Sequence, residues 1–200
     1  SFSEVNIMGS INVLNVMVEL GVKNIIFSSS ASVYGEPCYL PLDELHPTNP
    51  TNYYGFTKLT IENLIQWYSK IHGINFVCLR YFNAVGYDIN NRISIPEKQS
   101  NNLFPIIMEV LSGKRKSLNI FGNDYETIDG TCIRDYIHVN DLSLAHIKAL
   151  SFLMTKNTGL CINLGTGKGY SILDIIKSTE KIIGKKVKYN FSERRPGDPK

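Results

Sequence analysis

A cluster of serines and a tyrosine-lysine pair are the residues of this chain best suited to chemistry. Ser28, Ser29 and Ser30 close an apolar run, and Tyr54 stands four residues before Lys58 at the start of a helical pattern. A phenol with an ordinary pKa near ~10 is a poor base at neutral pH, but a lysine one helical turn away lies on the same face and stabilises the phenolate. Tyr54 can then accept a proton, and the Ser30 hydroxyl can relay it. The pattern indicates proton and hydride chemistry on a sugar or alcohol carbon.

Two rival interpretations bear on this pair. Tyr53 is a second phenol, but the residue four positions later is Thr57, so Tyr54 is the better candidate. A Tyr-x-x-x-Lys pattern alone is also common on ordinary helix surfaces. Ser30, however, follows a predicted strand. In parallel sheets, ligands bind at the carboxyl ends of the strands, which is where Ser30 would lie. The combination of the two motifs therefore predicts a site.

The elements that must position these residues alternate between helix and strand. Apolar spacing predicts the helices, buried apolar runs predict the strands, and four prolines exclude a long helix from the segment between the two motifs. The expected elements are a helix over 5–20, a strand over 24–28, a loop over 34–52, a helix over 54–72 and a strand over 75–81. This order predicts an α/β fold with a doubly wound parallel sheet of the Rossmann-like kind.

The sequence changes character after Asn83, where a polar, irregular stretch begins. A second, smaller α/β domain is predicted from about residue 84. The elements expected after residue 84 are helices over 103–111, 141–153 and 171–183 and strands over 117–121, 134–138, 160–164 and 186–191. Some of them could belong to a segment that returns to the first domain.

Composition is that of a globular intracellular enzyme. The 200 residues are 43% hydrophobic and 20% charged, with a net charge of +3, so no nucleic-acid partner is expected. The four cysteines form no Cys-x-x-Cys pair and the histidines show no metal-ligand spacing, so no metal site is expected. No apolar run reaches membrane-spanning length and no signal peptide is recognised, so no membrane association and a cytoplasmic location are expected.

A glycine-rich run, Gly165-x-Gly167-x-Gly169, invites a phosphate-binding interpretation. Its spacing is not Gly-x-Gly-x-x-Gly, and Ser171 after it is a good helix N-cap, so a structural turn is predicted. The predicted chemistry would nevertheless need a nicotinamide as hydride acceptor. Either the cofactor or part of the chain is therefore missing.

Six motifs, among them the two already described, carry a resemblance to a known family. They are Ser28-Ser29-Ser30-Ala31-Ser32-Val33-Tyr34-Gly35, Tyr54-Gly55-Phe56-Thr57-Lys58, Leu79-Arg80-Tyr81-Phe82-Asn83, Asn101-Asn102-Leu103, Ile120-Phe121-Gly122-Asn123-Asp124-Tyr125 and Asp129-Gly130-Thr131-Cys132-Ile133-Arg134-Asp135-Tyr136-Ile137-His138-Val139. Together, in this order, they resemble the UDP-glucose 4-epimerase family of extended short-chain dehydrogenases/reductases.

The resemblance implies an NAD(P)-binding Rossmann-like domain and a UDP-sugar-binding domain. Residues 1–83 would be the C-terminal part of the first, and 84–200 mainly the second, with about 132–155 returning to the first. Family members begin with a glycine-rich turn, so the chain is expected to be an internal fragment that lacks this turn and the C-terminal tail. Alone, it is expected to bind cofactor poorly and to be inactive.

The family's chemistry assigns roles around Tyr54. Tyr54 would take the proton of the sugar 4-hydroxyl while the C4 hydride passes to NAD and returns to the other face, which interconverts UDP-galactose and UDP-glucose. Lys58 would bind the nicotinamide ribose and, together with the positive charge of the nicotinamide, lower the Tyr54 pKa, and Ser30 would hydrogen-bond the reacting oxygen. The expected cofactor contacts are Asn6, Ser28, Ser30, Tyr54, Lys58 and Phe82.

The substrate contacts implied by the family lie mostly after residue 82. They are Ser30, Tyr54, Asn83, Asn102, Leu103, Asn119, Phe121, Arg134, Arg195 and Asp198. Arg134 and Arg195 suit a diphosphate because guanidinium groups bind phosphate oxygens in pairs. A homodimer is also implied, through the helices that include residues 6–20 and 54–72.

Other enzymes of the family remain alternatives. Dehydratases place an acidic pair where this chain has Ala31 and Ser32, which disfavours elimination. A UDP-GlcNAc or UDP-pentose 4-epimerase, a decarboxylase, or a non-catalytic NAD or nucleotide-sugar binder also remain. Two departures from the family pattern are Tyr53, where many relatives have proline, and residues 96–100, which could alter the loop before Asn102 and Leu103.

Overall fold

The computed structural model describes residues 2–90, 92–93 and 101–195 of the chain. These form two compact units. The first contains Ser1–Phe82 and Asp141–Gly165, and the second contains Asn83–Asn140 and Thr166–Lys200. Each unit is described by itself.

The first unit is built on a parallel sheet of β1 (Asn24–Ser30), β2 (Asn75–Tyr81) and β6 (Gly159–Leu164), in the order β1-β2-β6. Ser30 pairs with Tyr81, which in turn pairs with Leu164, so the three strands end at the same edge of the sheet. Functional side chains at the carboxyl end of one strand are thereby brought beside those of the next.

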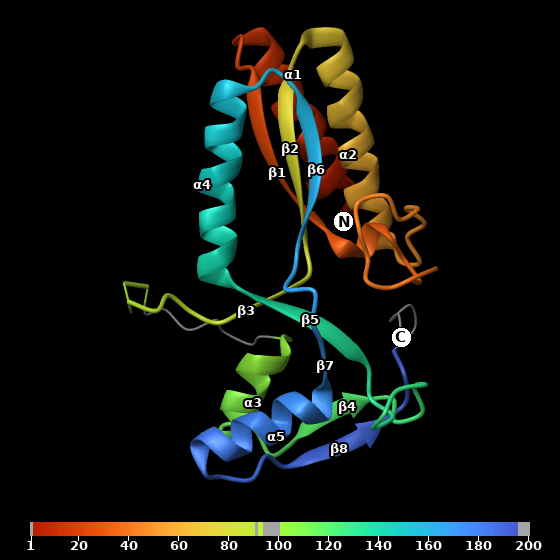
Figure 1. Cartoon of the computed structure of the whole chain (residues 1–200), viewed down its shortest axis with the longest axis vertical. Helices are drawn as coiled ribbons and strands as arrows, with labels where there is room; N and C mark the ends of the chain where they lie inside the picture. The colour runs from red at the N-terminus through yellow and green to blue at the C-terminus, as the bar shows by residue number, and fades with distance from the viewer. Residues whose placement is uncertain (1, 91, 94–100, 196–200) are drawn as a thin grey trace. The chain divides into compact units, whose positions relative to one another are not determined.

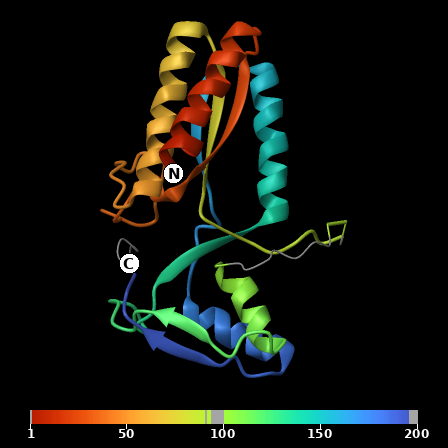
Figure 2. The same ribbon diagram turned by 180° about the vertical axis from the view of Figure 1, so that it is seen from behind.

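Helices cover both faces of this sheet (Figures 1 and 2). A π-helical segment, η1 (Ser3–Met8), continues into α1 (Gly9–Glu19). These and α2 (Tyr53–His72) lie on one face, where Leu14, Ile61 and Cys78 share a core. On the other face lies α4 (Val139–Thr155), whose Ala149 and Leu153 pack against Val77 and Leu79. The expected α/β, Rossmann-like, doubly wound arrangement is confirmed.

The ends of α2 are fixed by the residues that flank it. The Asn52 side chain accepts a hydrogen bond from the Gly55 amide at 2.8 Å, and the helix stops at Gly73, whose φ of 66° lies in the left-handed region. The preceding segment contains the short 3-10 helix η2 (Ala31–Val33) and no other helix or strand until α2. Asn52 therefore sets where Tyr54 and Lys58 enter the helix.

The second unit packs two helices on short strands. Its elements are β3 (Asn83–Val85), α3 (Leu103–Leu111), β4 (Leu118–Phe121), β5 (Ile133–His138), β7 (Gly169–Ser171), α5 (Ile172–Ile183) and β8 (Tyr189–Ser192). β5 pairs with β3 in parallel and with β7 antiparallel, and β4 pairs with β8 in parallel. Ile107, Ile120, Ile176 and Val187 form the core.

Most predicted elements are observed, with two strands added. β3 and β7 are three residues each and had no sequence signal. Ser171 caps α5 as predicted, because its hydroxyl accepts from the Asp174 amide. The segment that returns to the first unit begins at Asp141 and runs to Gly165, later than the expected 132–155, because β5 pairs inside the second unit and β6 inside the first.

Candidate active site

The serine cluster lies at the end of β1, with its side chains on alternate faces. Ile25 and Phe27 pack with α1 and α2, and Ile26 packs with α4. Strand alternation therefore puts Ser29 on the α2 face and Ser28 and Ser30 on the α4 face. Ser29 is buried, whereas Ser28 is exposed.

Tyr54 and Lys58 lie one turn apart on α2 and meet the same strand. The Lys58 ammonium donates to the Ser28 carbonyl oxygen at 3.0 Å and lies 5.6 Å from the centroid of the Tyr54 ring. The backbone of Ser28 is thus held by the lysine, and the tyrosine ring lies on the same side. The structure brings together the predicted residues Ser28, Tyr54 and Lys58.

The electrostatics of this group bear on the expectation that Lys58 and the positive charge of the nicotinamide together lower the Tyr54 pKa. Burial raises the pKa of Tyr54, and a hydrogen bond with Ser30 opposes this only in part. Burial also lowers the pKa of Lys58. The lysine directs its ammonium at the Ser28 carbonyl oxygen, which agrees with a need for further positive charge to make Tyr54 a base near neutral pH.

Tyr53, the rival phenol, lies in different surroundings. Its hydroxyl pairs with the Ser3 hydroxyl of η1, and its ring stacks on Phe56 with centroids 5.9 Å apart. Among the residues that the structure describes, no lysine or arginine lies over the Tyr53 ring to stabilise a phenolate, as Lys58 does near the ring of Tyr54. This geometry favours Tyr54.

Tyr81 and His146 join the site although neither was among the predicted site residues. The Tyr81 hydroxyl lies 2.8 Å from Ser28 Oγ and 2.7 Å from His146 Nε2, and His146 Nδ1 lies 2.7 Å from the Leu142 carbonyl oxygen. Burial raises the pKa of Tyr81, a hydrogen bond with Ser28 lowers it, and the charge of a Tyr54 phenolate would raise it. The two phenols are therefore electrostatically coupled. The signal that could have found Tyr81 is its place at the end of a buried strand beside the serine strand.

The remaining cofactor candidates have structural contacts. The Asn6 side-chain amide donates to Thr57 Oγ1 at 3.1 Å, which ties η1 to α2. The Phe82 amide donates to the Leu164 carbonyl at 3.1 Å, just beyond β2. Their contacts with a cofactor stay predictions.

In the second unit, two predicted substrate residues meet directly. The Arg195 guanidinium lies 3.8 Å from the centroid of the Phe121 ring, which is a cation-π contact. Asn119 and Phe121 share one face of β4, because Leu118 and Ile120 are buried on the other. Arg195, Phe121 and Asn119 thus lie on or against the face of β4 that points away from the core.

The other predicted substrate residues lie on separate elements. Asn83 pairs with Tyr136 in the β3-β5 ladder, and Arg134 of β5 donates to the neighbouring Ile133 carbonyl at 2.9 Å. Asn102 precedes α3 at its N-cap position, and Leu103 is the first residue of that helix and packs against its core. Asp198 lies outside the described residues.

Two absences are limited to the part of the chain that the structure describes. Within it, no three His, Cys, Asp or Glu side chains gather as a metal site would require. Also within it, no helix combines the length and the apolar character needed to span a bilayer. The expectations of no metal and no membrane partner stay predictions.

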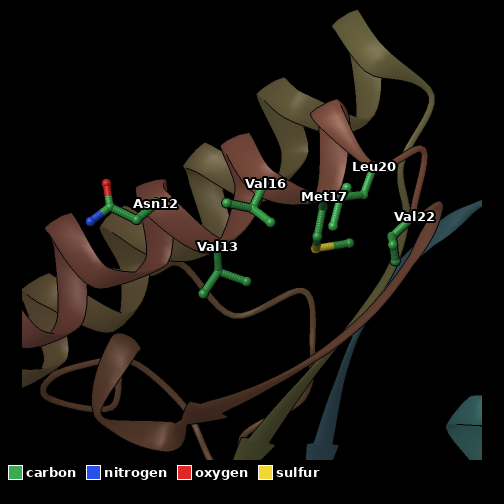
Figure 3. Close-up of a pocket in the computed structure, with 6 residues that line it drawn as sticks. All are labelled: Asn12, Val13, Val16, Met17, Leu20 and Val22. Atoms are coloured by element: carbon green, nitrogen blue, oxygen red, sulfur yellow. The ribbon is translucent and has the colours of Figure 1, made fainter.

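A shallow apolar hollow lies away from the serine strand end, along α1 (Figure 3). It has a volume of about 320 Å³. Its lining consists of Asn12, Val13, Val16, Met17, Leu20 and Val22. The hollow contains no group that could perform acid-base chemistry, so the candidate site is the one around Tyr54.

Comparison with known proteins identifies the class to which this fold and site belong. The model of the NAD dependent epimerase/dehydratase family matches residues 1–165, and the chain belongs to that family. Within it, the chain is similar to curated UDP-glucose 4-epimerases. The human protein is 48% identical over 200 residues, covering 98% of this chain and 58% of the relative, and that of Halalkalibacterium halodurans is 44% identical over 198 residues, covering 99% and 59%.

Solved structures agree with these relatives. UDP-glucose 4-epimerase from Brucella ovis in complex with NAD has a TM-score of 0.93 and 41% identity, covering 99% of this chain and 61% of that one. The Bifidobacterium longum enzyme in complex with NAD+ and UDP has a TM-score of 0.91 and 41% identity, covering 97% and 58%. The chain therefore spans about three fifths of the length of the proteins it matches.

Proposed function

We propose that this chain supplies the catalytic residues of a UDP-glucose 4-epimerase, an enzyme that interconverts UDP-galactose and UDP-glucose. We take the whole enzyme to have the same length as the relatives described above. The observation that carries the proposal is the meeting of Tyr54 and Lys58 with the Ser28–Ser30 strand end, in a chain 48% identical to the human enzyme. Below, the full-length protein means the protein of that length.

The cofactor proposed is NAD, and the residues at the strand end fit it. An exposed hydroxyl at Ser28, the Lys58 ammonium and the Tyr54 phenol lie at the carboxyl edge of a parallel sheet, where dinucleotides bind in folds of this class. When bound, NAD would take up the hydride from C4 of the sugar and return it. Ser28, Ser30, Tyr54 and Lys58 would face its nicotinamide end, and Asn6 and Phe82 are further candidate contacts.

Tyr54 moves the proton in the proposed reaction. Its phenolate accepts the proton of the sugar 4-hydroxyl as the C4–H bond breaks, and the sugar becomes a 4-ketone. Tyr54 then gives the proton back to the same oxygen when hydride returns to the opposite face of C4. Protons and electrons balance over the cycle, with inversion at C4 and no net oxidation.

Ser30 and Lys58 make this proton transfer possible. The Ser30 hydroxyl donates to Ser32 Oγ at 3.1 Å and also interacts with Tyr54. With substrate bound, it would turn to donate to the sugar oxygen as that oxygen gains negative charge. Lys58 adds a positive charge 5.6 Å from the Tyr54 ring centroid. Because burial alone raises the Tyr54 pKa, the positive charge of oxidised nicotinamide is proposed to supply the remaining stabilisation of the phenolate.

The second unit is proposed to bind the UDP part of the substrate. Arg195, which lies over Phe121, and Arg134 have the fork geometry that binds diphosphate oxygens in pairs. Asn83, Asn102, Leu103, Asn119 and Asp198 are the other proposed contacts. Firm binding of the nucleotide would leave the keto sugar free to present either face to the hydride.

A homodimer through α1 and α2 is part of the proposal. Val13, Val16, Trp67 and Ile71 expose apolar surface on these helices, which supports a protein partner there. Val16→Glu in the full-length protein should then turn a dimer into a monomer in sedimentation, and an unchanged dimer would place the interface elsewhere. The cytoplasmic location stays a prediction.

A substrate panel tests the function. The full-length protein is incubated with catalytic NAD+ and, separately, UDP-galactose, UDP-N-acetylgalactosamine, a UDP-pentose and UDP-glucuronate, and products are separated by chromatography. C4 epimerisation of UDP-galactose supports the proposal. A 4-keto-6-deoxy or decarboxylated product would assign the protein to another enzyme of the family, and binding without any product would make it a non-catalytic binder.

A further inference from the structure

The hydrogen-bond chain from Leu142 to Ser28 has a direction that the chemistry of its members determines. The Leu142 carbonyl can only accept, so His146 Nδ1, at 2.7 Å from it, carries the proton. In a neutral imidazole the other nitrogen is then an acceptor. The Tyr81 hydroxyl, 2.7 Å away, must therefore donate its one proton to His146 Nε2. In its contact with Ser28 Oγ at 2.8 Å, Tyr81 can then only accept, so Ser28 is the donor.

The direction of this chain determines which hydrogen bonds Ser28 can still make. Its one hydroxyl proton is directed at Tyr81, and what remains of its side chain is a pair of acceptor sites. Its carbonyl oxygen is already bound by the Lys58 ammonium at 3.0 Å. An exposed Ser28 therefore offers a ligand a hydrogen-bond acceptor and no donor.

A doubly protonated imidazole would reverse the chain. The titratable groups that face it are Tyr81 of β2, whose hydroxyl contacts the imidazole, and beyond Ser28 the Lys58 ammonium and Tyr54 of α2. A positive charge on His146 would add to that of Lys58 on the other side of Ser28. The direction derived above is therefore that of a ring protonated on Nδ1 alone.

We infer that Tyr81 and His146 are positioning residues that make Ser28 an acceptor for the carboxamide amino group of the nicotinamide. The inference rests on the proposed function. An amide N–H group is a strict donor, which matches a strict acceptor, whereas ribose hydroxyls can serve in either role. NAD has two such amino groups. Ser28 is held by Lys58 beside the reacting phenol, so the amino group that it meets is the one on the reacting ring.

A cofactor analogue tests the inference. In 3-acetylpyridine adenine dinucleotide a methyl group replaces the carboxamide amino group, so the donor is lost. We compare the dissociation constants of the full-length protein for NAD+ and for this analogue. The ratio should favour NAD+, and Ser28→Ala and Tyr81→Phe should each lower that preference by about three- to tenfold, which is the value of one hydrogen bond.

Tyr68→Phe is the matched control. It also removes a hydrogen-bonded phenol hydroxyl, which donates to Asn15 Oδ1 on the α1 side of the unit, and should leave the ratio unchanged. Equal ratios in the parent protein, Ser28→Ala and Tyr81→Phe would overturn the inference while leaving the proposed function intact. Failure of the parent protein to bind either dinucleotide would overturn the proposed function itself.

A second measurement needs no substitution. Nitrogen-15 and carbon-13 NMR shifts of the His146 ring report which nitrogen carries the proton. The inference predicts a neutral ring with its proton on Nδ1 and an acceptor at Nε2. A ring protonated at Nε2, alone or together with Nδ1, would contradict it because Ser28 would no longer be forced to donate to Tyr81.

Discussion

Glu62 holds Arg80 in the interior of the first unit by two hydrogen bonds, from Nε to Oε1 at 3.0 Å and from Nη2 to Oε2 at 2.7 Å. The carboxylate also accepts from the Ser29 hydroxyl at 2.5 Å. Burial lowers the pKa of Arg80, but Glu62 outweighs this and raises it above its ordinary value. Glu62 lies one turn beyond Lys58 and Ser29 lies between the two site serines, so the pair fastens α2 to the strand end.

The network continues into the segment between the two motifs. Arg80 donates to the Tyr34 hydroxyl at 2.8 Å, and Tyr34 donates to Asn163 Oδ1 at 2.7 Å. The Asn163 amide side chain in turn donates to the Leu42 carbonyl at 3.2 Å. Buried polar groups thus connect α2, β1, β2, β6 and the loop that precedes Tyr54.

Removing one member of the buried pair should be costly. Glu62→Leu leaves the Arg80 charge buried without its counter-ion and should lower the free energy of unfolding by about 3–5 kcal/mol. The double variant Glu62→Leu, Arg80→Met should recover much of this, because no charge remains buried. Urea unfolding of the full-length protein measures both. A single variant as stable as the parent would contradict a structural role for the pair.

Tyr54→Phe should lower turnover by about 10²–10⁴-fold and keep UDP-sugar binding. The phenol is the proposed proton acceptor, and such groups contribute about 10²–10⁴ in rate. Tyr53→Phe is the control, since its hydroxyl pairs with Ser3 instead. Turnover numbers and UDP-galactose dissociation constants are measured for both. If the Tyr53 variant lost activity and the Tyr54 variant kept it, the roles assigned to the two phenols would be wrong.

Replacing Lys58 should move the pH dependence of turnover. Burial raises the Tyr54 pKa, and the base must be ionised to work, so the rate rises with pH as the phenol loses its proton. Lys58→Met removes a stabilising positive charge, raises the Tyr54 pKa further and should shift the rising limb to higher pH by about one unit or more. Lys70→Met, at the far end of α2 over the Trp67 ring, should leave the profile in place. An unshifted limb in Lys58→Met would refute its electrostatic role.

Arg195→Lys should weaken UDP binding by about tenfold. Lysine keeps the charge but loses the planar fork and its stacking on Phe121. Arg194→Lys is the neighbouring control, because Arg194 binds Asp124 and lies over Tyr125 instead. Calorimetric titration with UDP compares the two. Equal affinities in both variants would remove Arg195 from the proposed diphosphate site.

Local signals in the sequence sufficed for the main elements. Four prolines predicted the loop before α2, and the buried apolar run over residues 75–81 gave the bounds of β2. The spacing of Tyr54 and Lys58 predicted that both lie on one side of a helix, and they do. These features depend on residues close together in the chain.

Short strands and side-chain contacts that depend on residues far apart in the chain were not predicted from the sequence. β3 and β7 exist because they pair with β5, and three residues carry too weak a pattern to show it. Tyr81 and His146 meet across 65 positions. No signal in the sequence singled out Glu62, which is fully buried because Arg80 and Ser29 satisfy its carboxylate. Only the fold reveals such partners.

The central claim is transient oxidation at C4 with Tyr54 as proton acceptor, and an isotope label tests it most directly. UDP-galactose carrying deuterium at C4 is incubated with the full-length protein and catalytic NAD+, and proton and deuterium NMR follow the sugar. The account predicts UDP-glucose with deuterium retained at C4 and, in Tyr54→Phe, conversion slower by about 10²–10⁴-fold. Loss of the deuterium to solvent, or conversion by Tyr54→Phe at the rate of the parent protein, would contradict it.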